Sequence, residues 1–314
     1  MPTSPDSAIR VQGLVRQFGS VRAVDHLSFD VPQGSITGLI GPNGAGKTTT
    51  LRILATLDLP DAGRAEIMGF DVFRAPWHVR RRVGFVSDVT GVVEHLSVRE
   101  YLAFLGQCRG HRGAALDGAI DRAAAITGVG PLADRLVTAL SKGQLRRLGV
   151  AGALLGDPAV LLLDEPAAGL DPSARMELRE VLRQLVRERA MTVLISSHIL
   201  RELEHLADRL VVMAHGRLAY SGLVHGLPAV AEVPIEVEPA LGALPAVLTW
   251  LQAQTDVAEV AQHGLLVRFR TEAAPEDLLE RAVRAGIRIR QFREVARDLE
   301  AVYRQAVSTS EAPS

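Results

Sequence analysis

Residues 35–50 read SITGLIGPNGAGKTTT, and this stretch decides the fold of the 314-residue chain. Apolar residues predict a short buried strand over 35–40, a glycine-rich turn follows, and helical spacing runs over 47–57. Gly41, Gly46, Lys47 and Thr48 occupy the fixed places of the pattern G-x-x-x-x-G-K-[ST]. In such a loop, consecutive backbone N–H groups and the start of the helix bind phosphate oxygens. The stretch therefore predicts a nucleotide site between a strand and a helix.

The loop also supplies two side chains with distinct chemistry. Lys47 is suited to neutralise phosphate charge, and the Thr48 hydroxyl is a hard oxygen ligand for Mg²⁺. An accidental match to the pattern is expected in on the order of one in a thousand chains of this composition. We expect nucleotide contacts from nine consecutive residues: Gly41, Pro42, Asn43, Gly44, Ala45, Gly46, Lys47, Thr48 and Thr49.

The pattern around the loop predicts an α/β fold. Apolar and polar residues alternate over 8–17 and 21–31, which indicates two antiparallel strands. Short apolar strands are predicted at 83–86, 160–163 and 192–196, helices at 173–189 and 199–207, and a hairpin over 210–220, with a largely helical stretch from about 88 to 139. Strands that alternate with helices in this way predict a mostly parallel sheet.

The C-terminal part has a different pattern. From residue 233 to 292 the elements follow the order βαββαβ, which predicts a small ferredoxin-like α+β module. A last helix is predicted over 298–306, before a polar tail at 308–314 that we expect to be disordered. The expected domains are residues 8–222, with a helical subdomain at about 88–155, and an accessory domain at 230–307.

Composition excludes several classes of protein. The 35 basic residues nearly balance the 36 acidic ones, so a chain-wide nucleic-acid-binding field is not expected. The apolar runs fall far short of the ~20 residues that span a bilayer, and residues 1–7 carry no hydrophobic signal segment. The single cysteine, Cys108, fits a reducing compartment. We therefore expect a cytoplasmic protein of two domains.

Two acids end the predicted strand at 160–163. Asp164 is suited to hold Mg²⁺ through water, and Glu165 to accept a proton from an attacking water. Acids at strand ends are common and usually solvated, so the pair alone is weak evidence for catalysis. Beside a phosphate loop it becomes strong evidence. The sequence thus predicts a site for phosphoryl chemistry.

A second anion site is suggested by Leu140-Ser141-Lys142-Gly143-Gln144. Ser141 and Gln144 have the spacing of a capping box, so a helix should begin here. A helix start with a nearby lysine attracts anions. An ordinary helix cap is the alternative interpretation.

These motifs occur in the order seen in ATP-binding-cassette ATPases, and the chain resembles that family over about residues 8–222. The resemblance rests on the phosphate loop, residues 140–144, the strand ending at Glu165, and His198. Residues 168–171 (AGLD) resemble the family's D-loop, and Phe18 stands where an adenine-stacking aromatic is expected. The C-terminal part, with DLEAVY at 298–303, looks like the extra domain of bacterial drug and antibiotic exporter ATPases.

The resemblance implies a head-to-tail dimer that closes on two molecules of ATP with Mg²⁺. Each phosphate loop would face Ser141, Gly143 and Gln144 of the second copy, with Asp171 also near the nucleotide. Phe18 would stack on the base, and His198 would contact the γ-phosphate as a donor. A buried core role for Phe18 and a structural role for His198 are the alternatives.

One position departs from the family's pattern. After the strand at 83–86 the family usually has Gln, which touches Mg²⁺ and the attacking water and couples their movement to the membrane partner. Here Ser87-Asp88 stands in its place. Asp88 offers an oxygen ligand that is one methylene shorter and negatively charged. We expect Asp88 to keep the coupling role with altered metal affinity.

The resemblance implies that the chain is the ATPase subunit of a membrane exporter. Such a subunit requires an integral membrane permease as its partner. A soluble regulatory or assembly ATPase is the alternative from another class. A degenerate nucleotide-binding scaffold is disfavoured, because Lys47, Asp164, Glu165 and His198 are all present.

Overall fold

The computed structural model describes residues 7–88, 91, 93–224, 233–263, 266–271 and 275–294. The chain divides into two compact units between residues 225 and 226. The helix predicted over 298–306 and the tail at 308–314 lie outside the described residues.

A six-stranded sheet forms the centre of the first unit. Its order is β10-β9-β3-β8-β7-β6, and all neighbouring pairs are parallel except β9 with the edge strand β10. The strands are β3 (Ile36–Ile40), β6 (Val83–Val86), β7 (Val160–Leu163), β8 (Thr192–Ser197), β9 (Arg209–Ala214) and β10 (Arg217–Leu223). Every residue of β3, β7 and β8 is buried, as expected of a parallel sheet covered on both faces. The carboxyl ends of the parallel strands β3, β8, β7 and β6 meet at one edge, which brings the four segments that follow them together.

A second, antiparallel sheet has the order β2-β1-β4-β5. It contains β1 (Ser7–Phe18), β2 (Val21–Pro32), β4 (Ala62–Ile67) and β5 (Phe70–Asp71). Helix α1 (Lys47–Leu54) packs in the same hydrophobic core as both sheets, with Leu51, Ile53 and Leu54 fully buried. The helix ends earlier than the predicted residue 57, because Thr56 takes a left-handed backbone with φ 60°.

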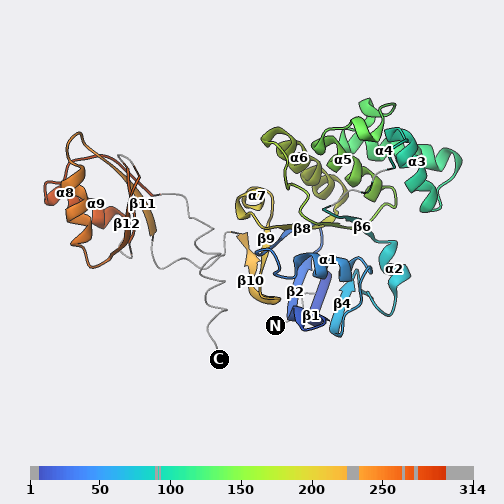
Figure 1. Ribbon diagram of the computed structural model, residues 1–314, viewed down its shortest axis with the longest axis horizontal. Coiled ribbons are helices and arrows are strands. Elements are labelled where there is room, and N and C mark those ends of the chain that lie inside the picture. The colour runs from blue at the N-terminus through green and yellow to red at the C-terminus, as the bar shows by residue number, and fades with distance from the viewer. Residues whose placement is uncertain are drawn as a thin grey trace. The chain divides into compact units, whose positions relative to one another are not determined.

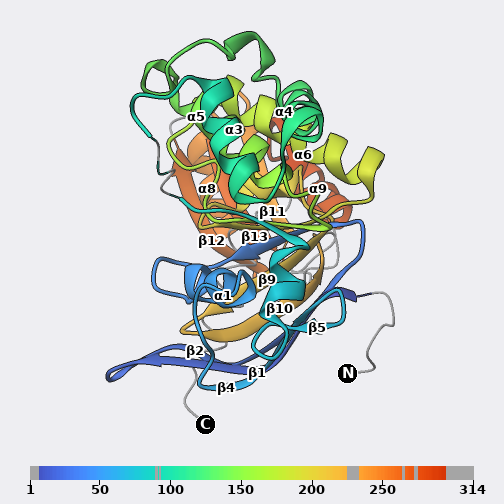
Figure 2. The ribbon, with the colours of Figure 1, turned by 90° about the vertical axis from the view of Figure 1, so that its right-hand side faces the viewer.

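The remaining helices of this unit gather mainly on one side of the large sheet. Figures 1 and 2 show α3, α4 and α5 together there, with β1, β2 and β4 on the other side. The helices are α2 (Pro76–Arg80), α3 (Val98–Cys108), α4 (Gly113–Thr127), α5 (Lys142–Leu154), α6 (Pro172–Arg189) and α7 (Leu200–Glu204), with 3₁₀ turns η1 (Gly130–Leu132) and η2 (Val137–Ala139). Within the described residues, no helix combines the length and apolar character needed to cross a bilayer.

The second unit follows the predicted order of elements. These are β11 (Val233–Pro239), α8 (Leu244–Gln252), β12 (Val257–His263), β13 (Leu266–Thr271), α9 (Pro275–Arg284) and β14 (Ile289–Glu294). The strands pair antiparallel in the order β12-β13-β11-β14, over a core that includes Ile235, Phe269 and Leu278. Assignment of this unit to the ferredoxin-like class stays a prediction.

Candidate active site

The phosphate loop joins β3 to α1, as the sequence predicts. Lys47 is the first residue of α1, and its side chain is buried, with Nζ donating to the carbonyls of Gly41 (2.7 Å) and Pro42 (3.2 Å). Gly46 has φ 98°, and a Cβ there would lie 2.2 Å from the carbonyl oxygen of Ala23. No side chain of the described chain caps α1, so its first N–H groups are available to an anion.

Two acids follow β7 directly, and a serine of the neighbouring strand holds both. The fully buried Ser196 donates its hydroxyl to Oδ1 of Asp164 at 2.7 Å. The Ser196 hydroxyl oxygen in turn accepts the N–H of Glu165 at 2.8 Å. Glu165 has φ 46°, a left-handed conformation that costs roughly 1–2 kcal/mol for a residue of its kind. The Ser196 hydroxyl therefore stabilises a strained turn, a role that sequence reasoning did not assign to it.

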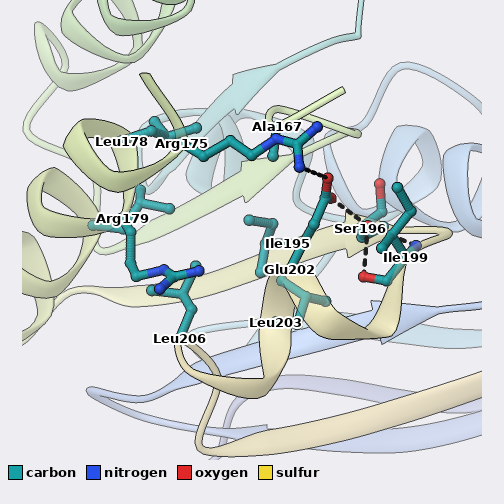
Figure 3. Close-up of a pocket in the computed structure, with 12 residues that line it drawn as sticks. Ala167, Arg175, Leu178, Arg179, Ile195, Ser196, Ile199, Glu202, Leu203 and Leu206 are labelled. Atoms are coloured by element: carbon teal, nitrogen blue, oxygen red, sulfur yellow. Dashed lines mark hydrogen bonds and ion pairs between the residues drawn. The ribbon is translucent and has the colours of Figure 1, made fainter. Parts of the chain in front are cut away.

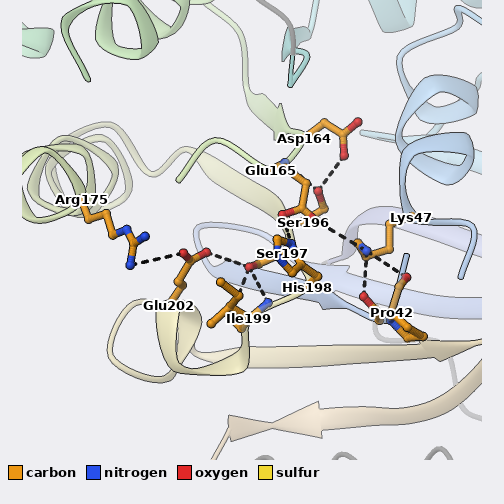
Figure 4. Close-up of polar contacts among 11 residues, drawn as sticks. Pro42, Lys47, Asp164, Glu165, Arg175, Ser196, Ser197, His198, Ile199 and Glu202 are labelled. Carbon is orange, nitrogen blue, oxygen red and sulfur yellow. Dashed lines mark hydrogen bonds and ion pairs between the residues drawn. The ribbon is translucent and has the colours of Figure 1, made fainter. Parts of the chain in front are cut away.

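Glu165 contacts both the phosphate loop and His198. Its Oε1 lies 3.4 Å from Nζ of Lys47, and its Oε2 accepts a hydrogen bond from Nδ1 of His198 at 2.8 Å (Figure 4). Lys47, Glu165 and His198 thus form one polar cluster at the carboxyl edge of the sheet. The cluster unites three residues that the sequence predicts for the site.

An open cavity of about 580 Å³ lies over this cluster. The predicted site residues that line it are Asn43, Gly44, Ala45, Gly46, Lys47, Thr48, Thr49, Asp88, Glu165 and His198. Val21, Ala23, Arg146 and Ala168 complete the lining. Gly41 and Pro42 contact the site through Lys47, and Asp164 is buried behind Ser196. The cavity is thus lined by the phosphate loop and by the carboxylate of Glu165, as a site for phosphoryl chemistry requires.

The donors around the cavity fit a hard divalent cation. Thr48 and Asp88 line the cavity, and the buried Asp164 is bonded through its Oδ1 to Ser196. Hydroxyl and carboxylate oxygens suit Mg²⁺, which keeps several waters and uses substrate phosphates rather than a dedicated protein cage. The residues present therefore fit this ion.

Arg146 is a residue of the site that sequence reasoning missed. It lies on α5 and donates from Nη1 to the carbonyl of Ser87 at 2.7 Å. Burial lowers the pKa of Arg146, while the nearby carboxylates of Asp88 and Asp164 oppose that shift. Arg146 therefore contributes positive charge beside the residues expected to hold Mg²⁺.

Comparisons with known proteins cover this part of the chain. The family model described as ABC transporter matches residues 24–168. The daunorubicin/doxorubicin resistance ATP-binding protein DrrA of Streptomyces peucetius is 42% identical over 225 residues, which are 71% of this chain and 67% of that protein. The chain belongs to the ATP-binding-cassette transporter family. The bacitracin transport ATP-binding protein BcrA of Bacillus licheniformis is 41% identical over 211 residues, covering 67% of this chain and 68% of that protein.

A solved structure agrees on the fold of the cassette. The structure of cbiO1 from Clostridium perfringens, part of the ABC transporter complex cbiONQ, aligns with a TM-score of 0.64 at 26% identity. The alignment covers 72% of this chain and 92% of that one. The P-loop fold of an ABC ATPase is thereby confirmed.

The second predicted anion site of the ABC cassette, residues 140–144, begins a helix, as expected. Ser141 caps α5, and its hydroxyl and the Gln144 side chain form both hydrogen bonds of a capping box. A Cβ at Gly143 would lie 2.6 Å from Cβ of Ala174 on α6, so close helix packing also requires this glycine. Asp171 caps α6 by accepting the N–H of Ala174 at 2.9 Å. None of these residues lines the cavity, and their contact with a nucleotide stays a prediction.

Phe18, the expected base-stacking residue of the ABC cassette, is not a core residue. Its side chain is 47% exposed at the end of β1, so the alternative of a buried aromatic is wrong. The guanidinium of Arg16 lies 4.4 Å from its ring centroid, and Arg16 pairs with Asp58 at 2.8 Å. One face of the ring is thus supported by a fixed cation. Contact with adenine stays a prediction.

The turn that carries His198 is fixed on its other side. Ser197 donates its hydroxyl to Oε2 of Glu202 at 2.8 Å and accepts the N–H of Ile199 at 3.0 Å. Arg175 of α6 lies 3.7 Å from Oε1 of Glu202. Figure 3 shows these groups at a smaller cavity of about 240 Å³ that is lined by residues of α6, β8 and α7. Buried contacts therefore hold the backbone on both sides of His198.

Proposed function

We propose that the chain binds and hydrolyses MgATP and thereby energises export through a separate membrane-spanning permease. The observation that carries this proposal is the cluster of Lys47, Glu165 and His198 beneath an open cavity with a phosphate loop. A nucleotide-binding scaffold that had lost ATPase activity would have no need of a carboxylate held beside Lys47.

The residues divide the work of hydrolysis among them. The loop amides and Lys47 bind the phosphates, and Glu165 accepts the proton of the attacking water. His198 donates a hydrogen bond to the γ-phosphate in place of Glu165. Thr48, Asp164 and Asp88 would hold Mg²⁺, which neutralises charge on the phosphates when it is bound.

Two copies of the chain complete the site. The start of α5, with Ser141, Gly143 and Gln144, would meet the γ-phosphate bound by the second copy, together with Asp171. The N-terminal end of a helix favours such an anion. Hydrolysis removes the bridging phosphate and reopens the dimer, which moves the permease.

The permease would hold the chain at the cytoplasmic face of the membrane. DrrA and BcrA are named for daunorubicin/doxorubicin resistance and bacitracin transport. An antibiotic is therefore the first class of cargo to test. We expect no nucleic-acid partner, because the net charge is -1.

The test combines a pull-down with one substitution. The chain is recovered from native membranes in mild detergent, with and without ATP, as wild type and as Glu165→Gln. We expect a polytopic permease to accompany it, and the variant to lose hydrolysis and accumulate an ATP-bound dimer. Glu188→Gln makes the same chemical change near the C-terminal end of α6, away from the cluster, and should behave as wild type.

Two outcomes would contradict the proposal. Recovery of soluble partners alone would favour the regulatory or assembly ATPase. Unchanged turnover in Glu165→Gln would remove this residue from the mechanism.

A further inference from the structure

The segment around α2 carries two exposed aromatic rings. Trp77 is 73% exposed and Phe73 61% exposed, four residues apart. A single exposed aromatic residue is ordinary on a protein surface. Two within five residues, one in the turn before α2 (Pro76–Arg80) and one on it, in a segment rich in arginine, call for a partner with both apolar and anionic character. We call Phe73, Arg74, Trp77 and Arg81, all exposed, the α2 face.

The α2 face belongs to a basic island in a nearly neutral chain. Residues 64–82 contain five arginines against two acids, which gives +3 where the whole chain has -1. Both acids are paired, because Arg64 contacts Glu66 at 2.7 Å and Asp71 at 3.1 Å. Among the described residues, the guanidinium groups of Arg74 and Arg81 enter no hydrogen bond or ion pair. Their charge is available to an outside anion.

Internal contacts hold the face in shape. Asp71 accepts the N–H groups of Phe73 and Arg74 at 2.9 and 3.0 Å. Arg80 donates to the Thr56 hydroxyl at 2.7 Å and lies 5.1 Å from the Trp77 ring centroid. The aromatic rings are therefore presented by a fixed turn, with little ordering left to do on binding.

We propose that the α2 face docks directly on a membrane surface of anionic lipid. Tryptophan and phenylalanine rings insert at the level of the headgroups, and arginines pair with lipid phosphates around them. Each basic residue near such a surface strengthens binding about fivefold. The contact would orient the ATPase at the bilayer in addition to its hold on the permease.

The experiment measures binding of the full chain to phosphatidylcholine vesicles with and without phosphatidylglycerol, in the absence of nucleotide and permease. We expect binding to the anionic vesicles only, weakened by salt. The double variant Arg74→Gln/Arg81→Gln should bind about 30-fold more weakly. The control Arg122→Gln/Arg135→Gln removes two exposed charges elsewhere in the first unit and should bind as wild type. Unchanged ATPase activity of both variants shows that they fold.

Trp77 provides an independent readout. The chain has two tryptophans, so Trp250→Phe leaves Trp77 as the sole reporter, and its emission should move to shorter wavelength on anionic vesicles. Equal binding to both kinds of vesicle, equal loss in both double variants, or binding without an emission shift would overturn the proposal. If Arg74→Gln/Arg81→Gln bound vesicles as wild type does but no longer recovered the permease in the pull-down, the proposal would be overturned in favour of a protein partner. Failure leaves the ATPase mechanism untouched, because no nucleotide enters the assay.

Discussion

Ser196 offers the sharpest test of how the acids are held. Its hydroxyl donates to Asp164 and accepts the N–H of Glu165, and no part of the residue is exposed. Ser196→Ala leaves one buried carboxylate oxygen and one backbone N–H without these partners. An unsatisfied buried group costs about 1–3 kcal/mol, so we expect the free energy of unfolding to fall by about 2–5 kcal/mol. The loss is measured by denaturant unfolding of the first unit.

The same change should slow hydrolysis. The left-handed backbone at Glu165 is held by the Ser196 hydroxyl, and its release moves the carboxylate away from the attacking water. A displacement of the order of 1 Å lowers a rate by up to about 100-fold, so we expect kcat to fall 10- to 100-fold. Single-turnover hydrolysis of ATP measures this step. Ser196→Thr restores the hydroxyl and should recover much of the rate, although its extra methyl group costs stability.

Thr127→Ala is the matched control. Thr127 is as deeply buried as Ser196, but its hydroxyl donates to one neutral carbonyl, that of Ala123, at 2.8 Å. Its loss should cost about 1 kcal/mol and leave hydrolysis unchanged. If Ser196→Ala matches Thr127→Ala in both stability and rate, the assigned role of Ser196 is wrong.

Three further predictions concern the base, the metal and acid stability. Phe18→Ala should weaken ATP binding by the roughly 1–3 kcal/mol of a stacked base while leaving the affinity for inorganic tripolyphosphate unchanged, and equal losses for both ligands in calorimetry would exclude stacking. Asp88→Ala should shift the Mg²⁺ concentration at half-maximal hydrolysis and reduce stimulation by the permease; a variant unaltered in both respects would show that Asp88 has no coupling role. Hydrogen bonds from Arg217 above all, then His26 and Arg22, hold the pKa of Asp25 well below its usual 3.8. The stability they supply is complete above pH of about 4 and is lost as pH falls toward the folded pKa, so Asp25→Asn should be less stable than wild type at neutral pH by a margin that shrinks on acidification. Unfolding curves recorded over the acidic range measure that margin, and a constant difference would contradict the assignment.

Local pattern was sufficient for the elements that carry the chemistry. Buried strands such as β7, the alternation in β1 and β2, and the capping box at Ser141 are each visible within a few residues. Their order along the chain then fixes which carboxyl ends meet, because parallel strands align at one edge of a sheet. The placement of Lys47 beside Glu165 follows from that rule.

Contacts between distant segments could not be predicted. Strand β4 pairs with β1 across some fifty residues, and its own sequence, AGRAEI, has no clear alternation. Arg146 matters because α5 brings it to the carbonyl of Ser87 at the end of β6. Ser196 has its role because β8 lies beside β7. In each case the decisive partner is supplied by tertiary packing rather than by neighbours in sequence.

The salt bridge between Lys47 and Glu165 has a consequence for nucleotide affinity itself. In this structure the protein's own carboxylate engages the lysine and the histidine that the γ-phosphate would engage, so it acts as an internal competitor of the ligand. Glu165→Gln removes the competitor's charge as well as the proposed general base. Part of any tighter nucleotide binding in that variant would then precede chemistry, and it should appear with a non-hydrolysable ATP analogue, which carries the γ-phosphate but cannot react. The residue proposed as general base would therefore also limit how firmly the cassette binds its nucleotide before the dimer closes.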